Sequence, residues 1–149
     1  ALSLVGRLHE GIDKYKRLLK EDPLDPSNHL YLGFAYTLAA DYERAEMMLR
    51  EGLKLAPEDP YLLNALGDVL IRFERHDEAI AAWKKALAFE HDLLDSRYAL
   101  AEAFELQGDI SAALDQWEWI VQYLQDKPGA EMALVEAEEK LKTFKEGRS

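Results

Sequence analysis

Residues 26–59 read PSNHLYLGFAYTLAADYERAEMMLREGLKLAPED, and the apolar pattern of this stretch recurs along the chain at a fixed offset of 34 residues. We call residues in register when they are separated by that offset or by a multiple of it. The clearest matches stand in register at Leu32, Leu66 and Leu100 and at Ala45, Ala79 and Ala113. Self-similarity at such a period is typical of a solenoid of stacked two-helix units. The sequence therefore predicts an all-α fold.

One small and one large residue recur at fixed places in each unit. The small position holds Gly33, Gly67 and Ala101, and the large position holds Leu49, Trp83 and Trp117. If the two helices of a unit pair antiparallel, the small residues allow their backbones to approach closely. We expect the large side chains to fill the space between successive units, which makes both tryptophans core residues.

This order of motifs resembles the tetratricopeptide repeat. The resemblance rests on a Leu-Gly pair at Leu32 and Gly33, the aromatic Tyr36, Ala45 and a closing Pro57, and it covers nearly the whole chain. It implies a right-handed α-solenoid of antiparallel helix pairs. It also implies a non-enzymatic function, because repeats of this family bind peptides or other proteins.

The period divides the chain into one domain with three complete repeats. We expect a partial leading repeat at residues 1–25, repeats at residues 26–59, 60–93 and 94–128, and a capping helix at residues 129–149. Gly11 and Tyr15 are in register with Ala45 and Leu49, so the leading segment is the second helix of a repeat whose first helix is mostly missing. We expect this segment to be one continuous helix through Gly6.

Capping residues and prolines set the expected helix limits. Asp25 and Asp59 each precede a proline, which suits the first position of a helix, and Asp41 is a further expected cap. The expected helices span residues 26–39, 42–55, 60–73, 77–90, 93–107, 110–125 and 130–146. Pro128 stands three residues later than the period of 34 residues predicts for the proline that closes the third repeat. We place Glu138 of the last helix at the position that Gly33 holds in the first complete repeat.

Composition excludes several classes of function. The chain has 18 basic and 29 acidic residues, a net charge of −11, which repels the phosphates of nucleic acids. No cysteine is present, and the four histidines lack the spacing of a metal site. No nucleotide-binding glycine motif and no apolar stretch of membrane-spanning length occurs. We therefore expect no enzyme activity, no cofactor, no metal and no membrane span.

By the same resemblance, a second stripe on the first helix of each repeat lines a concave groove where a partner peptide or helix docks. The residues expected there are Leu30, Phe34, Tyr61, Asn64, Asp68, Arg72, Asp95, Tyr98, Glu102 and Glu105. The stripe changes from apolar and aromatic to acidic, with only Arg72 nearby to offset the acids. A ligand with one or two apolar anchors followed by lysine or arginine would fit it.

One subset of the family grips the C-terminal carboxylate of chaperone tails with lysine, asparagine and arginine side chains. The positions that would supply this clamp hold Leu30, Phe34, Ala65, Asp95 and Ala99. None of them matches, and Asp95 has the wrong charge. The sequence therefore argues against a chaperone-tail adaptor.

Two other interpretations remain open. The chain could assemble with copies of itself, either through its apolar N-terminal half-repeat or through Trp119, whose register mates Lys85 and Glu51 should face water. The other possibility for Trp119 is that the last helix covers it, so that it is not exposed. A third interpretation makes this domain the regulatory part of a longer enzyme.

Overall fold

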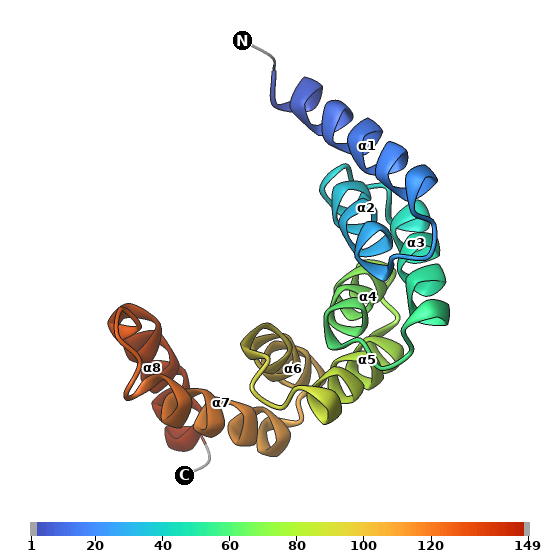
Figure 1. Ribbon diagram of the computed structural model, residues 1–149. Coiled ribbons are helices and arrows are strands. Elements are labelled where there is room, and N and C mark those ends of the chain that lie inside the picture. The colour runs from blue at the N-terminus through green and yellow to red at the C-terminus, as the bar shows by residue number, and fades with distance from the viewer. Residues whose placement is uncertain (1–2, 148–149) are drawn as a thin grey trace. The chain divides into compact units, whose positions relative to one another are not determined.

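The computed structural model describes residues 3–147, which form eight helices joined by short turns and contain no strand (Figure 1). Their bounds are α1 (Leu4–Glu21), α2 (Pro26–Leu38), α3 (Tyr42–Leu55), α4 (Pro60–Arg72), α5 (His76–Phe89), α6 (Leu94–Gln107), α7 (Ile110–Leu124) and α8 (Glu131–Glu146). The all-α prediction is confirmed. Each of the seven helices expected after residue 25 agrees with the structure to within one residue at either end.

The predicted caps explain where these helices begin. The Asp25 carboxylate accepts a hydrogen bond from the backbone N–H of Ser27 at 2.9 Å, and Asp59 does the same for Tyr61 at 2.9 Å. Asp41 accepts from the N–H of Arg44 at 3.2 Å. A side-chain acceptor is needed at each place because the first N–H groups of a helix have no partner within it. Helix α1 runs unbroken through Gly6, as expected.

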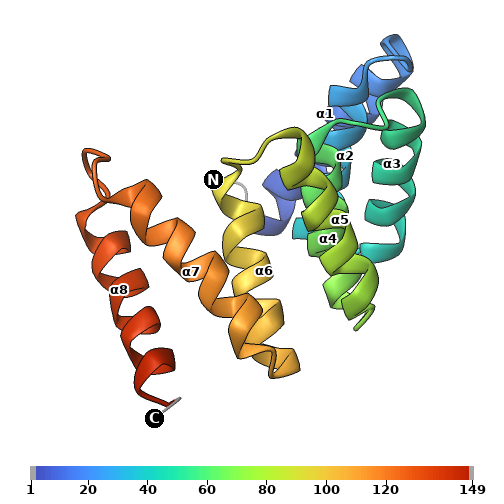
Figure 2. The same cartoon turned by 90° about the horizontal axis from the view of Figure 1, so that it is seen from below.

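The chain divides into two compact units, which are described separately. The first unit ends at His91 and holds α1–α5, and the second begins at Asp92 and holds α6–α8. In the first unit α2 pairs with α3 and α4 with α5, while α3 also packs against α4 and α1 against α2. In the second unit α7 lies beside both α6 and α8 (Figure 2).

A small-to-large contact holds each described pair in the first unit together. A methyl group added to Gly33 would lie 2.8 Å from Leu49 Cδ2, and one added to Gly67 would lie 2.7 Å from Trp83 Cδ1. Leu49 and Trp83, both buried, therefore pack against the glycine of their own pair.

The contact between successive pairs is made at a different glycine. A methyl group on Gly52 of α3 would lie 3.0 Å from Leu62 Cδ2 on α4 and 3.0 Å from His29 Cβ on α2. Gly52 is in register with Ala86, which is fully buried in α5. Close packing between pairs thus depends on a second small position, which the sequence analysis did not single out.

The turns inside the pairs share one backbone conformation. Ala40, Glu74 and Gly108 are in register, and each has a positive φ, of 58°, 57° and 77° respectively. Glycine adopts this left-handed conformation without cost, whereas a residue with a Cβ is strained in it by about 1 kcal/mol or more. Only the third of these turns uses glycine.

The register of α8 corrects one prediction. Ala137 is only 1% exposed and is in register with the buried Ala35, Val69 and Ala103. The residue at the position of Gly33 is therefore Val135, and not Glu138. The helix does begin three residues late, but this delay is confined to the turn at Pro128 and Gly129, where Gly129 has a φ of +81°. The helix then resumes the period.

We predict that Gly67→Ala destabilises the protein by about 1–3 kcal/mol, because the added methyl group collides with the Trp83 indole. The control is Gly11→Ala, since a methyl group on Gly11 meets no atom within 4 Å. That substitution should leave stability unchanged or raise it by up to about 1 kcal/mol through helix propensity. Thermal unfolding followed by circular dichroism measures both, and equal melting temperatures for Gly67→Ala and the parent would contradict the packing described.

Candidate protein-binding surface

Two aromatic residues predicted for the groove lie at the surface of the first unit. Phe34 on α2 is 42% exposed, and Tyr61 at the start of α4 is 50% exposed. The Tyr61 hydroxyl donates a hydrogen bond to Glu90 Oε1 at 3.2 Å, which orients its ring without burying it. Leu30 on α2 is half-buried. Helices α2 and α4 contact each other, so these side chains belong to neighbouring first helices.

Phe34 also lines a groove of about 450 Å³ between α1 and α2. The α1 wall includes Arg7, Gly11 and Tyr15, and the α2 wall includes Tyr31, Phe34 and Leu38. The ring of Tyr31 stacks on that of Tyr15, with centroids 5.6 Å apart. Sequence reasoning missed Tyr31 and Leu38 because they lie on the side of α2 that faces α1, and the predicted groove did not include α1.

The other predicted residues of α4 have neighbours inside the unit. Asn64 is only 8% exposed. Asp68 Oδ1 accepts a hydrogen bond from the indole N–H of Trp83 at 3.2 Å. The Arg72 guanidinium lies over the Tyr42 ring, 5.9 Å from its centroid. Asp68 is therefore also a structural partner of the core tryptophan, a role that sequence reasoning did not foresee.

Helix α6 carries the four predicted residues of the second unit. Asp95 and Glu102 are exposed, whereas Tyr98 is half-buried and meets Trp117 edge-on at 5.6 Å. Burial raises the pKa of Tyr98, and the nearby negative charge of Glu136 raises it further. The phenol therefore stays neutral well into the alkaline range.

Glu105 has two partners in the second unit. Its Oε1 accepts from the indole N–H of Trp117 at 2.6 Å, and its Oε2 accepts from Lys140 Nζ of α8 at 3.2 Å. Lys140 is a second cation beside the predicted acids, which corrects the expectation that only Arg72 offsets them. The four residues of α6 thus form two pairs. Asp95 and Glu102 are exposed acids, whereas Tyr98 and Glu105 both contact Trp117.

Trp119 of α7 is half-buried and held between two neighbours. The Arg97 guanidinium of α6 lies 4.3 Å from the centroid of its ring, and Tyr123 of α7 stacks on it at 4.9 Å. Neither of these two neighbours belongs to α8, the helix that was expected to cover Trp119. Burial lowers the pKa of Arg97.

Within residues 3–147, no group of three or more histidine, aspartate or glutamate side chains is arranged to hold a metal ion. No described helix is both long enough and apolar enough to cross a membrane.

Comparison with known proteins identifies the repeat. A model of the tetratricopeptide repeat family matches residues 35–92, a stretch that begins in α2 and ends beyond α5. This protein is a tetratricopeptide repeat protein.

The curated relatives include two peroxisomal targeting signal receptors. The peroxisomal targeting signal receptor of Kluyveromyces lactis is 33% identical over 91 residues, and that of Eremothecium gossypii is 31% identical over 91 residues. Each match covers 60% of this tetratricopeptide chain but only 16% of the receptor. The chain therefore spans about a sixth of the length of these relatives.

Solved structures show the same fold. The crystal structure of MamA has a TM-score of 0.78 at 22% identity, covering 99% of this chain and 86% of that one. The thermophilic TPR protein TTC0263 of Thermus thermophilus has a TM-score of 0.77 at 23% identity, covering 89% and 74% of the two chains. The translocator chaperone SycD of Yersinia enterocolitica has a TM-score of 0.74 at 16% identity, covering 82% and 84%. The predicted α-solenoid class is confirmed.

We predict that Glu105→Ala destabilises this tetratricopeptide domain by about 1–3 kcal/mol, because it leaves the buried indole N–H of Trp117 without its acceptor. Glu102→Ala is the matched control on the same helix. Glu102 is exposed, so its removal should change stability by no more than about 0.5 kcal/mol. Chemical unfolding followed by tryptophan fluorescence compares the two, and an equal loss in both variants would contradict the structural role of Glu105.

Proposed function

We propose that this tetratricopeptide repeat protein is a scaffold that binds a segment of another protein through the surface of α2 and α4, the first helices of its first two complete repeats. The observation that carries the proposal is the exposure of Phe34 and Tyr61 on the adjacent helices α2 and α4. Exposed aromatic side chains on rigid helices are strong anchors, because they contribute much contact area and lose little conformational entropy on binding. The tetratricopeptide fold typically serves as such a non-enzymatic scaffold.

The charge of the first helices favours a basic ligand. Asp95 and Glu102 of α6 are exposed, and the whole chain has a net charge of −11. Exposed acids attract cations over a distance but contribute only about 0.2–1 kcal/mol per contact, so they set on-rate and specificity more than affinity. We infer a ligand segment that carries one or two apolar anchors together with lysine or arginine.

The comparisons support the class of function and leave the partner open. Two relatives are named as receptors for a targeting signal, and one structural neighbour is named as a chaperone of a secretion translocator. All of these names describe proteins that act on other proteins. Because the match covers 16% of each receptor, their ligands are not transferred to this chain.

A displayed library of random peptides, selected on the purified protein, tests the proposal. The selected sequences should combine apolar anchors with lysine or arginine. Tyr61→Ala should weaken binding of a selected peptide by more than about 1 kcal/mol at every salt concentration, because Tyr61 acts as an anchor. The double reversal Asp95→Lys with Glu102→Lys should weaken binding mainly at low salt and flatten its salt dependence.

The control is Phe89→Ala, which removes an exposed aromatic residue of α5 that lies outside the proposed surface. It should leave the affinity unchanged. Glu105 is not reversed in this experiment, because its loss would disturb Trp117. Selection of acidic peptides, or equal effects of Tyr61→Ala and Phe89→Ala, would overturn the proposal.

A further inference from the structure

One lysine of the second unit lies in a site that is built from a carboxylate and two aromatic rings. Lys140 Nζ of α8 donates a hydrogen bond to Glu105 Oε2 of α6 at 3.2 Å. The same atom lies 5.8 Å from the centroid of the Trp117 ring on α7 and 5.9 Å from that of Phe144 on α8. Carboxylates and aromatic faces both attract a cation. We call Glu105, Trp117 and Phe144 the cation site.

The carboxylate of the cation site is held in place without the lysine. Glu105 Oε1 accepts from the indole N–H of Trp117 at 2.6 Å, and Oε2 is the atom that receives Lys140. The Glu105 side chain is only 18% exposed, whereas that of Lys140 is 50% exposed. The carboxylate is therefore part of the α6–α7 pair, and its cationic partner is a long side chain that reaches it from the surface.

A groove beside Lys140 leads to the cation site. It measures about 460 Å³ and is lined by Glu136, Glu139, Lys140, Thr143 and Phe144. This side of α8 faces α6, because Lys140 reaches Glu105 and because the negative charge of Glu136 raises the pKa of Tyr98 on α6. Glu136 and Glu139 are exposed. A cationic side chain that enters the groove is therefore attracted along its whole length.

We propose that the cation site binds an arginine side chain of the ligand segment, and that Lys140 occupies the site as an internal competitor until the ligand displaces it. This inference deepens the proposed function and rests on it for the class of ligand. It adds a site on α6, α7 and α8 to the aromatic anchors of α2 and α4.

The chemistry of the two cations explains the exchange. An ammonium group is a compact, strongly hydrated charge, and Lys140 makes its ion pair at the protein surface, where such pairs contribute little. A guanidinium group is planar and more weakly hydrated, offers several N–H donors to one carboxylate, and stacks on aromatic faces. Arginine therefore fits a carboxylate between two rings better than lysine does. Without a ligand, Lys140 keeps the charge of Glu105 paired.

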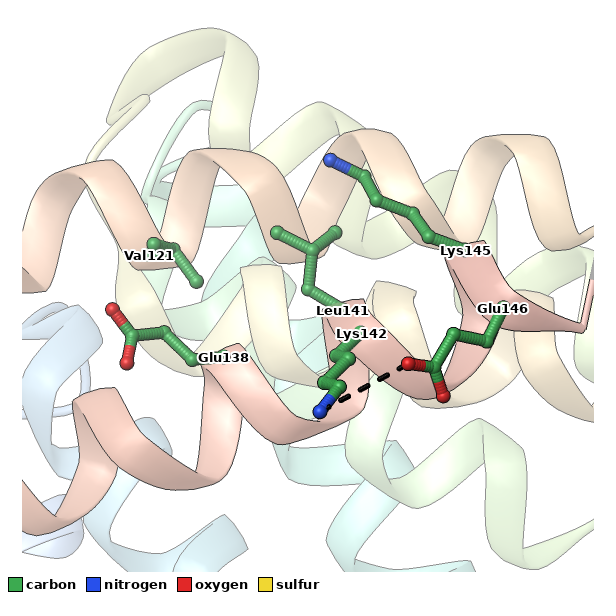
Figure 3. A pocket seen from close by; sticks show the side chains of 6 residues that line it. All are labelled: Val121, Glu138, Leu141, Lys142, Lys145 and Glu146. Carbon is green, nitrogen blue, oxygen red and sulfur yellow. Dashed lines mark ion pairs between the residues drawn. The ribbon is translucent and has the colours of Figure 1, made fainter.

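Two other lysines of α8 provide matched controls. Lys142 and Lys145 line a different pocket, of about 560 Å³, beside Val121 of α7 (Figure 3). Lys145 pairs with Glu118 of α7 at 3.0 Å, and Lys142 pairs with Glu146 at 3.9 Å. Neither lysine lines the groove beside Lys140. Lys145 thus resembles Lys140 in joining α8 to a neighbouring helix, but it lies outside the proposed site.

Nuclear magnetic resonance of the parent protein tests the displacement directly. The probe is a tripeptide of glycine, arginine and glycine with both ends blocked, and the control peptide carries citrulline, the neutral analogue of arginine. The rings of Trp117 and Phe144 shift the resonance of the Lys140 ε-methylene group. The arginine peptide should move this resonance towards that of a free lysine and should also shift the indole N–H resonance of Trp117. The citrulline peptide should leave both unchanged.

Variants identify the groups responsible. Lys140→Met keeps the apolar stem but removes the competing charge, so the arginine peptide should bind about two- to fivefold more tightly, as measured by the Trp117 indole resonance. Lys145→Met makes the same charge change and should leave the affinity unchanged. Glu105→Gln retains an acceptor for the Trp117 indole but loses the negative charge. It should weaken binding at least about tenfold while the melting temperature stays close to that of the parent.

Several results would overturn the proposal. One is a Lys140 resonance that does not move at saturating arginine peptide, or that moves equally with the citrulline peptide. Another is an equal gain in affinity in Lys140→Met and Lys145→Met, which would show that only total charge matters. Unweakened binding by Glu105→Gln would also contradict the site.

The outcome is independent of the test of the proposed function. Tyr61 belongs to the first unit, so Tyr61→Ala should leave binding of the arginine tripeptide unchanged. A failure of the anchors on α2 and α4 would appear only with the library peptides, as equal effects of Tyr61→Ala and Phe89→Ala. A failure of the cation site would appear only in the titrations with the arginine tripeptide.

Discussion

The structure depends on the contact between a glycine on one helix and a large side chain on its partner. Gly33 against Leu49 and Gly67 against Trp83 leave no room for even a methyl group, so the distance between the paired helices is set by the large residue alone. Tight packing of this kind permits few alternative arrangements, because interiors close-packed to this degree cannot absorb added volume.

The tryptophans bring a polar requirement with them. A buried indole N–H needs an acceptor, and Asp68 and Glu105 supply it for Trp83 and Trp117. The first complete repeat carries Leu49 at this position and has no such need. At the positions of Asp68 and Glu105 it has Phe34 and Thr37, neither of which is acidic. The acids of the first helices therefore belong partly to the core and only partly to the surface.

Much of the fold could be predicted from sequence because its signals are local. Aspartate before proline fixes the starts of α2 and α4, and the period of 34 residues fixes the register of the core. The site was less predictable, because a stripe on a helix does not reveal which acids are engaged by a neighbouring helix. The link between Glu105 and Lys140 joins residues 35 positions apart, and no pattern within one repeat contains it.

The three turns at Ala40, Glu74 and Gly108 show how the repeats share their conformational cost. Two of them keep a left-handed backbone at residues that disfavour it, so the packing between the two helices that each turn joins must be stable enough to impose it. The third reaches the same geometry at no cost. The turn residues can therefore differ from one repeat to the next while the contacts within the helix pairs stay the same. The packing of the pair determines the conformation of the turn, and not the reverse.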